Sequence, residues 1–452
     1  MDENPTESLP RYASAGIGAA SQSTPAPFRA SEAYKRYVLG LLFVVYVFNF
    51  VDRQIISILG EPIKREFGLS DAQFGLLTGI VFAAVYSLLG VPMARWADRS
   101  SRKLIITLSL AFWSAMTALG GLATGFGTLA LARLAVGVGE AGCSPPSHAL
   151  LADYFPAHQR GRAFSFYSTG IYIGILFGFV AGGLISQYFG WRWAFVVVGG
   201  PGVLLAVVVA LTLRDPPRGW ADGVIATATP QPSIPQALQI FWSIKSFRQI
   251  TIATSLHTFV TYGVGAFVPM FLARSHGMGQ AEIGAWLGPL TGFGGMAGSL
   301  LGGYLSDKLS SRDRRWAVWI GGYSVLATVP LALVSYLSPN VRVVLAITFP
   351  ALVLSSMYLG PALATLQGLA GLKMRAMCSA VFFLFINLIG NGIGPWVTGL
   401  ISDGLTPIAG RDALRYALAI MVLVNIWSFL HYMLAARSLR ADWEHRVGLP
   451  AA

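Results

Sequence analysis

The chain has 452 residues, of which 12% are charged and 54% are hydrophobic, and its net charge is +12 at pH 7. Soluble domains carry about 25% charged residues, so this composition excludes an ordinary soluble protein and indicates a membrane protein with many spans. The 51 glycines lie mostly within the apolar segments, where they let helices pack closely.

Twelve apolar segments are each long enough to cross a membrane as a helix, which needs about 20 residues. In chain order they cover residues 38–58, 72–95, 104–125, 128–152, 161–187, 193–213, 248–274, 281–306, 316–337, 341–371, 376–402 and 412–436. The longest internal polar stretch, 214–247, is expected to be a linker between two six-helix halves, 35–213 and 248–437. Residues 1–34 are rich in Ser, Ala and Pro and are expected to be a disordered tail. Residues 438–452 form a second tail.

The basic residues predict the orientation of the chain. In this topology both termini lie on one side, which holds 23 of the 32 Lys and Arg residues, against seven on the other side and two in the membrane. The positive-inside rule therefore places both termini in the cytoplasm. The positive charge reflects topology, so no nucleic-acid partner is expected. The N-terminal tail has no cleavage pattern of a signal peptide, so we predict a multi-pass protein, of the inner membrane in a bacterium.

A duplicated motif supports the division into two halves. After the second predicted helix, Asp98 is followed by the basic residues Arg99 and Arg102. After the eighth, Asp307 is followed by Arg312 and Arg314. Internal repeats of this kind are characteristic of secondary transporters.

Four charged residues lie inside predicted membrane helices: Asp52 and Arg53 in the first, and Arg133 and Glu140 in the fourth. Charges are costly in a bilayer and usually mark a path for ions or substrate. Arg133 and Glu140 are two helical turns apart on one face of their helix. Asp52 and Glu140 are candidate proton sites. The guanidinium of Arg133, whose forked donors suit phosphate or carboxylate, is the candidate anion ligand, a role that Arg53 can share. The alternative is that Asp52–Arg133 or Arg53–Glu140 pairs only hold the two helices together.

These motifs resemble those of the major facilitator superfamily, although Ala94 and Ser101 replace two glycines of its pattern after helix 2. The resemblance implies an all-α fold of twelve helices, transport by alternating access, and a central cavity lined by helices 1, 4, 7 and 10. With Asp52 and Arg53 on helix 1 and Arg133 and Glu140 on helix 4, it also implies that all four charges can converge on one cavity wall. It extends to a glycine stripe on helix 5, Gly170, Gly174, Gly178 and Gly182, which is expected to contact helix 8. Asn49–Arg53, Arg133, Glu140 and Pro145-Pro146 together resemble the Spinster family of sphingolipid and lysophospholipid transporters.

The second half lacks buried charges. Its candidate substrate contacts are polar and aromatic side chains, namely Thr258, Thr261, Tyr262, Tyr358 and Asn387, beside phenylalanines that include Phe267, Phe349, Phe382 and Phe383. We expect a proton-linked carrier that binds the head group of an amphipathic anionic lipid with Asn49, Arg53 and Arg133, and the acyl chain against the second half. The alternative function is a proton-linked carrier of a small organic anion such as a sugar acid. The alternative for the aromatic residues is that they only pack in the protein or face membrane lipids.

The resemblance also implies gates on the cytoplasmic side. Asp98 is expected to meet the start of helix 11. Arg99 or Arg102 is expected to meet Asp153, and Asp307 with Arg312 or Arg314 is expected to meet helix 5 near residues 160–162. The chain has no P-loop, no H-E-x-x-H cluster and no serine nucleophile elbow. We therefore predict no enzyme, such as a lipid enzyme, and no cofactor or metal. The intact gate motifs argue against a non-transporting sensor, and the resemblance implies a monomer.

Overall fold

The computed structural model describes residues 28–222, 234–371 and 374–447, and within them the protein is all-α, as predicted. The first half contains α1 (Glu32–Ile58), α2 (Gly60–Phe67), α3 (Asp71–Thr78), α4 (Ile80–Arg99), α5 (Arg102–Gly120), α6 (Phe126–Glu140), α7 (Ser144–Tyr154), α8 (Ala157–Phe189) and α9 (Trp191–Thr212). The second half contains α10 (Ile234–Ser243), α11 (Lys245–His276), α12 (Gln280–Ser310), α13 (Trp316–Leu337), α14 (Val341–Ser355), α15 (Leu359–Ala370), α16 (Arg375–Phe385), the π-helix η3 (Ile386–Ile393), α17 (Gly394–Ala409) and α18 (Ala413–Val447). Short 3-10 turns lie at η1 (Trp220–Asp222) and η4 (Gly410–Asp412).

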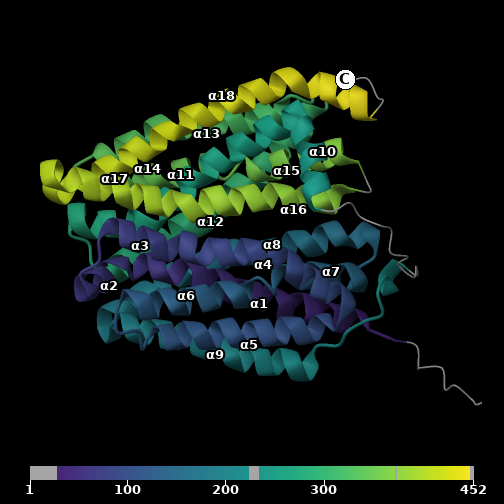
Figure 1. Cartoon of the computed structure of the whole chain (residues 1–452), viewed down its shortest axis with the longest axis horizontal. Helices are drawn as coiled ribbons and strands as arrows, with labels where there is room; N and C mark the ends of the chain where they lie inside the picture. Colours follow the sequence, from purple (N-terminus) through teal and green to yellow (C-terminus); the bar gives the residue numbers. More distant parts are fainter. Residues whose placement is uncertain (1–27, 223–233, 372–373, 448–452) are drawn as a thin grey trace, which may run out of the picture.

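The two halves form two layers of roughly parallel helices, with α1–α9 in one and α10–α18 in the other (Figure 1). The start of α1 and the end of α18 lie at the same end of the bundle, here named the terminal face. The opposite end, which holds α2 and the end of α17, is named the far face.

Ten segments of the described chain are long and apolar enough to cross a membrane. One of them, Met377–His445, contains both α17 and α18, and the 31-residue helix α12 is not among the ten. The count of twelve spans therefore stays a prediction.

Breaks interrupt several of the predicted helices. Two consecutive prolines inside an apolar segment predict a bend or break of helix 4 at Pro145-Pro146. The break is present: α6 ends at Glu140, and the two prolines lie in the first turn of α7, where a missing N–H is tolerated. Gly360-Pro361 likewise predicts a break in the tenth predicted helix, and the break between α14 and α15 lies slightly earlier in the chain. Two features were not predicted. One is the break at Gly79, between α3 and α4, and the other is the π-helix η3. Such π segments are frequent at functional sites.

The glycine stripe of helix 5 packs against a different helix from the one predicted. A Cβ atom on Gly174 would lie 2.6 Å from the Val47 carbonyl oxygen, so the stripe on α8 faces α1. The glycines of α12 do contact α8, but on another side, where a Cβ on Gly284 would lie 2.3 Å from the Phe179 oxygen. Neighbouring positions on a helix point about 100° apart, so α8 uses two faces for two partners.

The linker is held at both ends where the structure describes it. At its start, Asp215 accepts a hydrogen bond from the Lys103 amide at 3.2 Å, which docks the linker on the first half. At its end, the Trp242 ring of α10 stacks on Phe385 of α16, with centroids 4.9 Å apart. Residues 1–27 of the predicted tail 1–34 lie outside the described residues. The tail is shorter than predicted at its other end, because α1 begins at Glu32.

Candidate functional site

The four charges predicted to converge do lie on α1 and α6, beneath the interface of the two halves. Asp52, Arg133 and Glu140 are 2%, 3% and 0% exposed, whereas 16% of the Arg53 side chain is exposed. The helix α6 approaches α4 closely at Gly137, where a Cβ would lie 3.0 Å from the Phe82 oxygen. This close approach brings α6, which carries Arg133 and Glu140, next to Phe82 of α4.

Arg53 and Glu140 form an ion pair, with 2.6 Å between Arg53 Nε and Glu140 Oε2. The guanidinium also lies over the rings of Phe50, Phe82 and Tyr86, at 5.1, 5.1 and 4.5 Å from their centroids, which adds cation–π attraction. The second carboxylate oxygen, Glu140 Oε1, is buried and has no hydrogen-bond partner among the described residues.

Asp52 does not pair with Arg133. Both of its carboxylate oxygens instead accept from the Thr117 hydroxyl of α5, at 2.6 and 2.5 Å. Arg133 lies over the Phe82 ring at 5.3 Å, and its Nε and Nη1 have no hydrogen-bond partner in the part of the chain that the structure describes. Thr117 was not predicted, because a hydroxyl in an apolar helix carries no signal of its own in the sequence.

The buried polar cluster includes one more predicted residue. Asn49 is 0% exposed, and neither atom of its amide has a hydrogen-bond partner within the described ranges. The Asn49 amide lies close enough to Glu140 to interact with its carboxylate. Because unpartnered buried polar atoms are costly, the Arg133 guanidinium is the group of this cluster with spare donors.

The second half contributes two exposed polar residues at the middle of α11. Thr261 is exposed, and Tyr262 is 39% exposed and close enough to Arg53 to interact with it electrostatically. Asn387 on η3 is partly buried and donates to the Phe383 oxygen at 2.9 Å. Tyr262 of the second half therefore lies near Arg53 of the charged wall in the first half.

Two other predicted substrate contacts, Thr258 and Tyr358, are packed within the second half. Thr258 is 1% exposed and donates to the Thr254 oxygen at 2.6 Å. The Tyr358 hydroxyl lies 3.4 Å from the Thr258 hydroxyl, and its ring packs on His257. His257 in turn is fixed by Asn425 and the Ser355 oxygen, both at 2.9 Å, so it acts as a packing residue.

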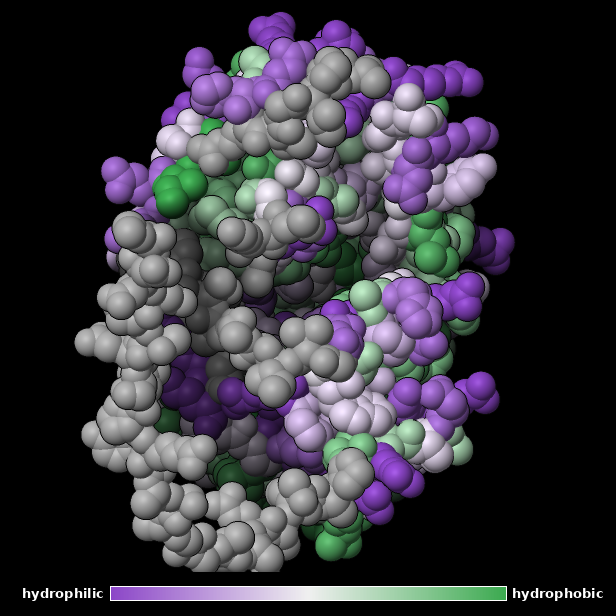
Figure 2. Space-filling view, turned by 90° about the vertical axis from the view of Figure 1, so that its right-hand side faces the viewer, coloured by the Kyte–Doolittle hydropathy of each residue, from purple (hydrophilic) through white to green (hydrophobic). Residues whose placement is uncertain are grey.

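The predicted aromatic wall is only partly present. Phe267 and Phe382 are fully buried in the core, whereas Phe349 and Phe383 are 40% and 37% exposed. Figure 2 looks onto the terminal face and shows a recess between the two halves, beside the residues drawn in grey.

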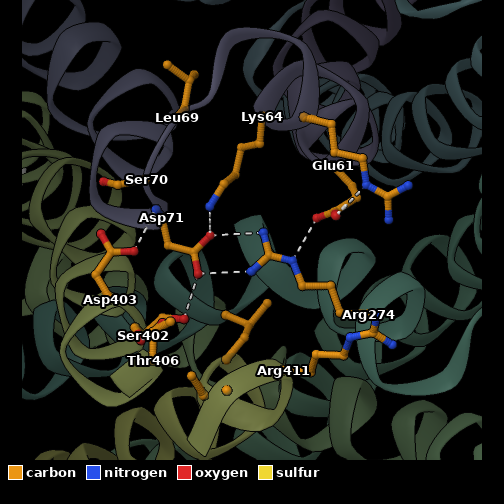
Figure 3. A pocket seen from close by; sticks show the side chains of 14 residues that line it. Glu61, Lys64, Leu69, Ser70, Asp71, Arg274, Ser402, Asp403, Thr406 and Arg411 are labelled. Atoms are coloured by element: carbon orange, nitrogen blue, oxygen red, sulfur yellow. Dashed lines mark hydrogen bonds and ion pairs between the residues drawn. The ribbon is translucent and has the colours of Figure 1, made fainter. Parts of the chain in front are cut away.

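The far face is closed by a charged cluster that joins the halves (Figure 3). Arg274 of α11 contacts Glu61 of α2 through Nε at 2.7 Å, and binds both oxygens of Asp71 of α3 at 3.0 Å each. Asp71 also pairs with Lys64 and accepts from the Ser402 hydroxyl of α17 at 2.6 Å. These residues, the far-face cluster, surround a pocket of about 310 Å³.

Asp403 adds a helix cap that crosses from one half to the other. Its two oxygens accept from the backbone amides of Asp71 and Ala72 at 2.9 and 2.8 Å, and an anion is favoured at a helix N-terminus. The helices are in direct backbone contact there, since a Cβ on Gly399 would lie 2.3 Å from the Asp71 oxygen. Sequence reasoning missed this cluster, since its residues lie far apart in the chain.

The predicted gate residues lie near the terminal face, at or beside the ends of α4, α7 and α12. Arg102 forms an ion pair with Asp153, as expected, and Asp153 also accepts from the Gly219 amide at 2.9 Å. Arg99, Asp307 and Arg312 are exposed.

The expected contact of Asp307, Arg312 or Arg314 with α8 near residues 160–162 is not present among the described residues. The Arg314 guanidinium lies 4.4 Å from the Trp443 ring centroid instead of meeting α8. Arg160 of α8 pairs with Asp222 at 2.5 Å. The predicted contact of Asp98 lies outside the described residues. The described residues contain no group of three or more His, Cys, Asp and Glu that could hold a metal ion.

Comparison with known proteins gives a consistent set of relatives. Residues 42–395 match the model of the Major Facilitator Superfamily. An MFS-type efflux pump of Mycolicibacterium smegmatis is 33% identical over 89% of this chain and 93% of its own length. Protein spinster homolog 1 of Homo sapiens is 27% identical over 90% of this chain and 81% of its own length.

A probable galactarate/D-glucarate transporter of Bacillus subtilis is 30% identical, but the match covers 64% of this chain and 68% of the relative. A crystal structure of a bacterial homolog to the human lysosomal transporter Spinster, inward-facing and unoccupied, has 31% identity and a TM-score of 0.81. It covers 91% of this chain and 99% of the solved one.

Proposed function

Because this chain belongs to the major facilitator superfamily and is an integral membrane transporter similar to Spinster proteins, we propose that it carries an amphipathic anionic lipid by alternating access. The lipid is of the lysophospholipid or sphingoid-phosphate class. The observation that carries the proposal is Arg133, a buried guanidinium whose Nε and Nη1 have no partner in the described chain, next to the more exposed Arg53. A buried cation with spare donors favours an anion that supplies the missing acceptors.

In this proposal a proton and the anion bind together. Glu140 neutralises Arg53 in the structure. When Glu140 takes up a proton it loses its charge and most of its attraction for the guanidinium, so an anionic head group can replace it on Arg53. Asp52, which is buried on the same wall, is the second proton site. Substrate binding then favours proton uptake, and proton uptake favours substrate binding.

The asymmetry between the halves sets the orientation of the lipid. The head group lies against Asn49, Arg53 and Arg133 of the first half. The acyl chain lies against the exposed aromatic side chains of the second half, Tyr262, Phe349 and Phe383. Thr261 and Asn387 lie near these rings on α11 and η3, where they can contact the glycerol or sphingoid backbone.

Alternating access requires the far-face cluster to open while the terminal face closes. In the closed terminal face, Asp98 meets the start of α16, and Arg99 lies beside it. Asp307, Arg312 and Arg314 approach α8. Arg102 and Asp153 hold their own half together in both states. Twelve spans, a monomer, cytoplasmic termini and a cytoplasmic terminal face complete the proposal.

A carrier of a small organic anion is the second candidate, and the similarity to a sugar-acid transporter supports it. That similarity covers 64% of the chain, whereas the human Spinster match covers 90%. The exposed aromatic rings of the second half also favour a substrate with an apolar part, since a sugar acid gives them nothing to bury.

The test is flux into proteoliposomes that contain the purified protein, with a labelled lysophospholipid or labelled D-glucarate and with or without a pH gradient. Lysophospholipid flux that the gradient drives, and that Arg133→Gln and Asp52→Asn both abolish, supports the proposal. Arg415→Gln, on the far face away from the site, is the control. Flux of D-glucarate alone would move the protein to the second candidate, and flux that ignores the gradient would remove the proton coupling.

A further inference from the structure

Asp52 and Arg133 carry opposite charges in the same buried cluster but do not form an ion pair. They are 2% and 3% exposed and close enough to interact electrostatically. An unpaired charge that is buried from solvent is costly, and direct pairing with an opposite charge normally reduces that cost. Something must therefore hold the Asp52 carboxylate away from the guanidinium.

The Thr117 hydroxyl is the group in position to do so. It is 2% exposed, projects from α5 and contacts both oxygens of Asp52, at 2.6 and 2.5 Å. Thr117 thus approaches Asp52 from a helix that carries none of the four charges. Its one proton serves two oxygens, so the carboxylate is directed toward α5 rather than toward α6.

We propose that Thr117 is a positioning residue that keeps Asp52 away from Arg133 and so leaves the Arg133 donors available to an anionic substrate. This inference rests on the proposed function of Arg133 as an anion ligand. Without Thr117, the carboxylate turns to the guanidinium, satisfies its N–H groups and neutralises the site before the substrate arrives.

A hydroxyl suits this role because it serves both protonation states of Asp52. It donates to the carboxylate, and it accepts from the carboxylic acid after Asp52 has gained a proton. The charged groups that act on Asp52 are Arg53 on its own helix and Arg133 and Glu140 on α6. Thr117 is the described hydrogen-bond partner of the Asp52 carboxylate on α5, and it lets the carboxyl group keep one orientation through a proton cycle.

The first measurement is the equilibrium Kd of a fluorescent lysophospholipid for the full chain in nanodiscs. We expect Thr117→Val, which keeps the shape but removes the hydroxyl, to raise Kd about tenfold, equivalent to about 1.4 kcal/mol. Thr117→Ser should bind like the wild type. Thr107→Val is the matched control, since the Thr107 hydroxyl on the same helix has no hydrogen-bond partner in the described chain.

The double variant Thr117→Val with Asp52→Asn separates positioning from packing. An asparagine cannot neutralise Arg133, so we expect it to restore Kd to within about threefold of the wild type. A purely structural role for Thr117 would leave the double variant as weak as Thr117→Val. That result, or wild-type affinity of Thr117→Val, would overturn the inference.

A second readout does not depend on any substrate. The apparent Tm is measured for Asp52→Asn, Arg133→Gln and both together, first in the wild type and then in the Thr117→Val background. The coupling is the difference between the Tm change of the double variant and the sum of the two single changes. We expect it to be about 1 °C or less in the wild type and at least about 3 °C in the Thr117→Val background. Equal coupling in the two backgrounds would overturn the inference. If the wild type does not bind lysophospholipid but the coupling appears as expected, the proposed substrate fails while the role of Thr117 stands.

Discussion

The far-face cluster holds the two halves together, and the proposed alternating access requires it to open, so its central cation should control the conformational equilibrium. Arg274 makes three charged contacts across the interface, one to Glu61 and two to Asp71. Removing one partner of a fully buried pair costs about 3–5 kcal/mol. When Arg274 is replaced, Asp71 still has its ion pair with Lys64 and its hydrogen bond from Ser402, so the cost is smaller than for a fully buried pair. For Arg274→Gln we therefore expect about 2–3 kcal/mol, or a shift of about 30- to 140-fold toward the state open at the far face.

The assay is the distance between spin labels placed on the two halves at the far face. Tyr188 at the end of α8 and Ile408 near the end of α17 are 70% and 87% exposed, so Tyr188→Cys and Ile408→Cys accept labels without disturbing the core. The native Cys143 and Cys378 are fully buried and will react little. We expect Arg274→Gln to add a longer-distance population that is rare without this substitution.

The matched control is Arg415→Gln. Arg415 also lies at the far face and is 15% exposed, but its ion pair with Asp412, at 3.6 Å, stays within one half. This variant should give the wild-type distance distribution. If Arg274→Gln remained folded and also kept that distribution, the cluster would not be a gate, and the energies assigned to its ion pairs would be wrong.

Two further predictions concern packing and pH. In Gly284→Ala the new Cβ would lie 2.3 Å from the Phe179 backbone oxygen, so we expect the apparent Tm to fall by about 2–6 °C; Gly200→Ala, where nothing lies within 4 Å, should not lower it. Hydrogen bonds to Glu66, first of all from the Trp191 indole at 2.7 Å, hold the pKa of Glu66 below its usual range. Its charge therefore stabilises the folded state above the unfolded pKa of about 4.3, and this contribution is lost as the pH falls through the folded-state pKa. Because the group is largely exposed, Glu66→Gln should lower the Tm by about 1 °C at neutral pH and by less at acidic pH; an equal difference at both would refute the assignment.

Much of the fold and the charged wall could be predicted from the sequence. An ionisable residue within a run of apolar residues is visible without any structure, and its cost in a bilayer gives it meaning. Asp52, Arg53, Arg133 and Glu140 were identified in this way, and they do lie on α1 and α6 beneath the interface. The break at Pro145-Pro146 follows from the missing N–H of proline, which is also a local property.

The partners of these residues required the tertiary structure. Which of the possible ion pairs forms depends on the rotation of each helix about its axis, and one residue changes the direction of a side chain by about 100°. The sequence allowed both an Asp52–Arg133 pair and an Arg53–Glu140 pair, and only the second is present. Thr117 binds Asp52 from a helix that carries no charge of this cluster.

The sequence by itself determined the class of the protein, its two halves and the cost of its buried charges, because these depend on composition and local spacing. Only the tertiary structure decided which helices are neighbours. It set the glycine stripe of α8 against α1, and it brought Arg274 and Asp403 to Asp71, about 200 and 330 residues away in the chain. Contacts at such separations arise from packing the two halves, and no local pattern encodes them.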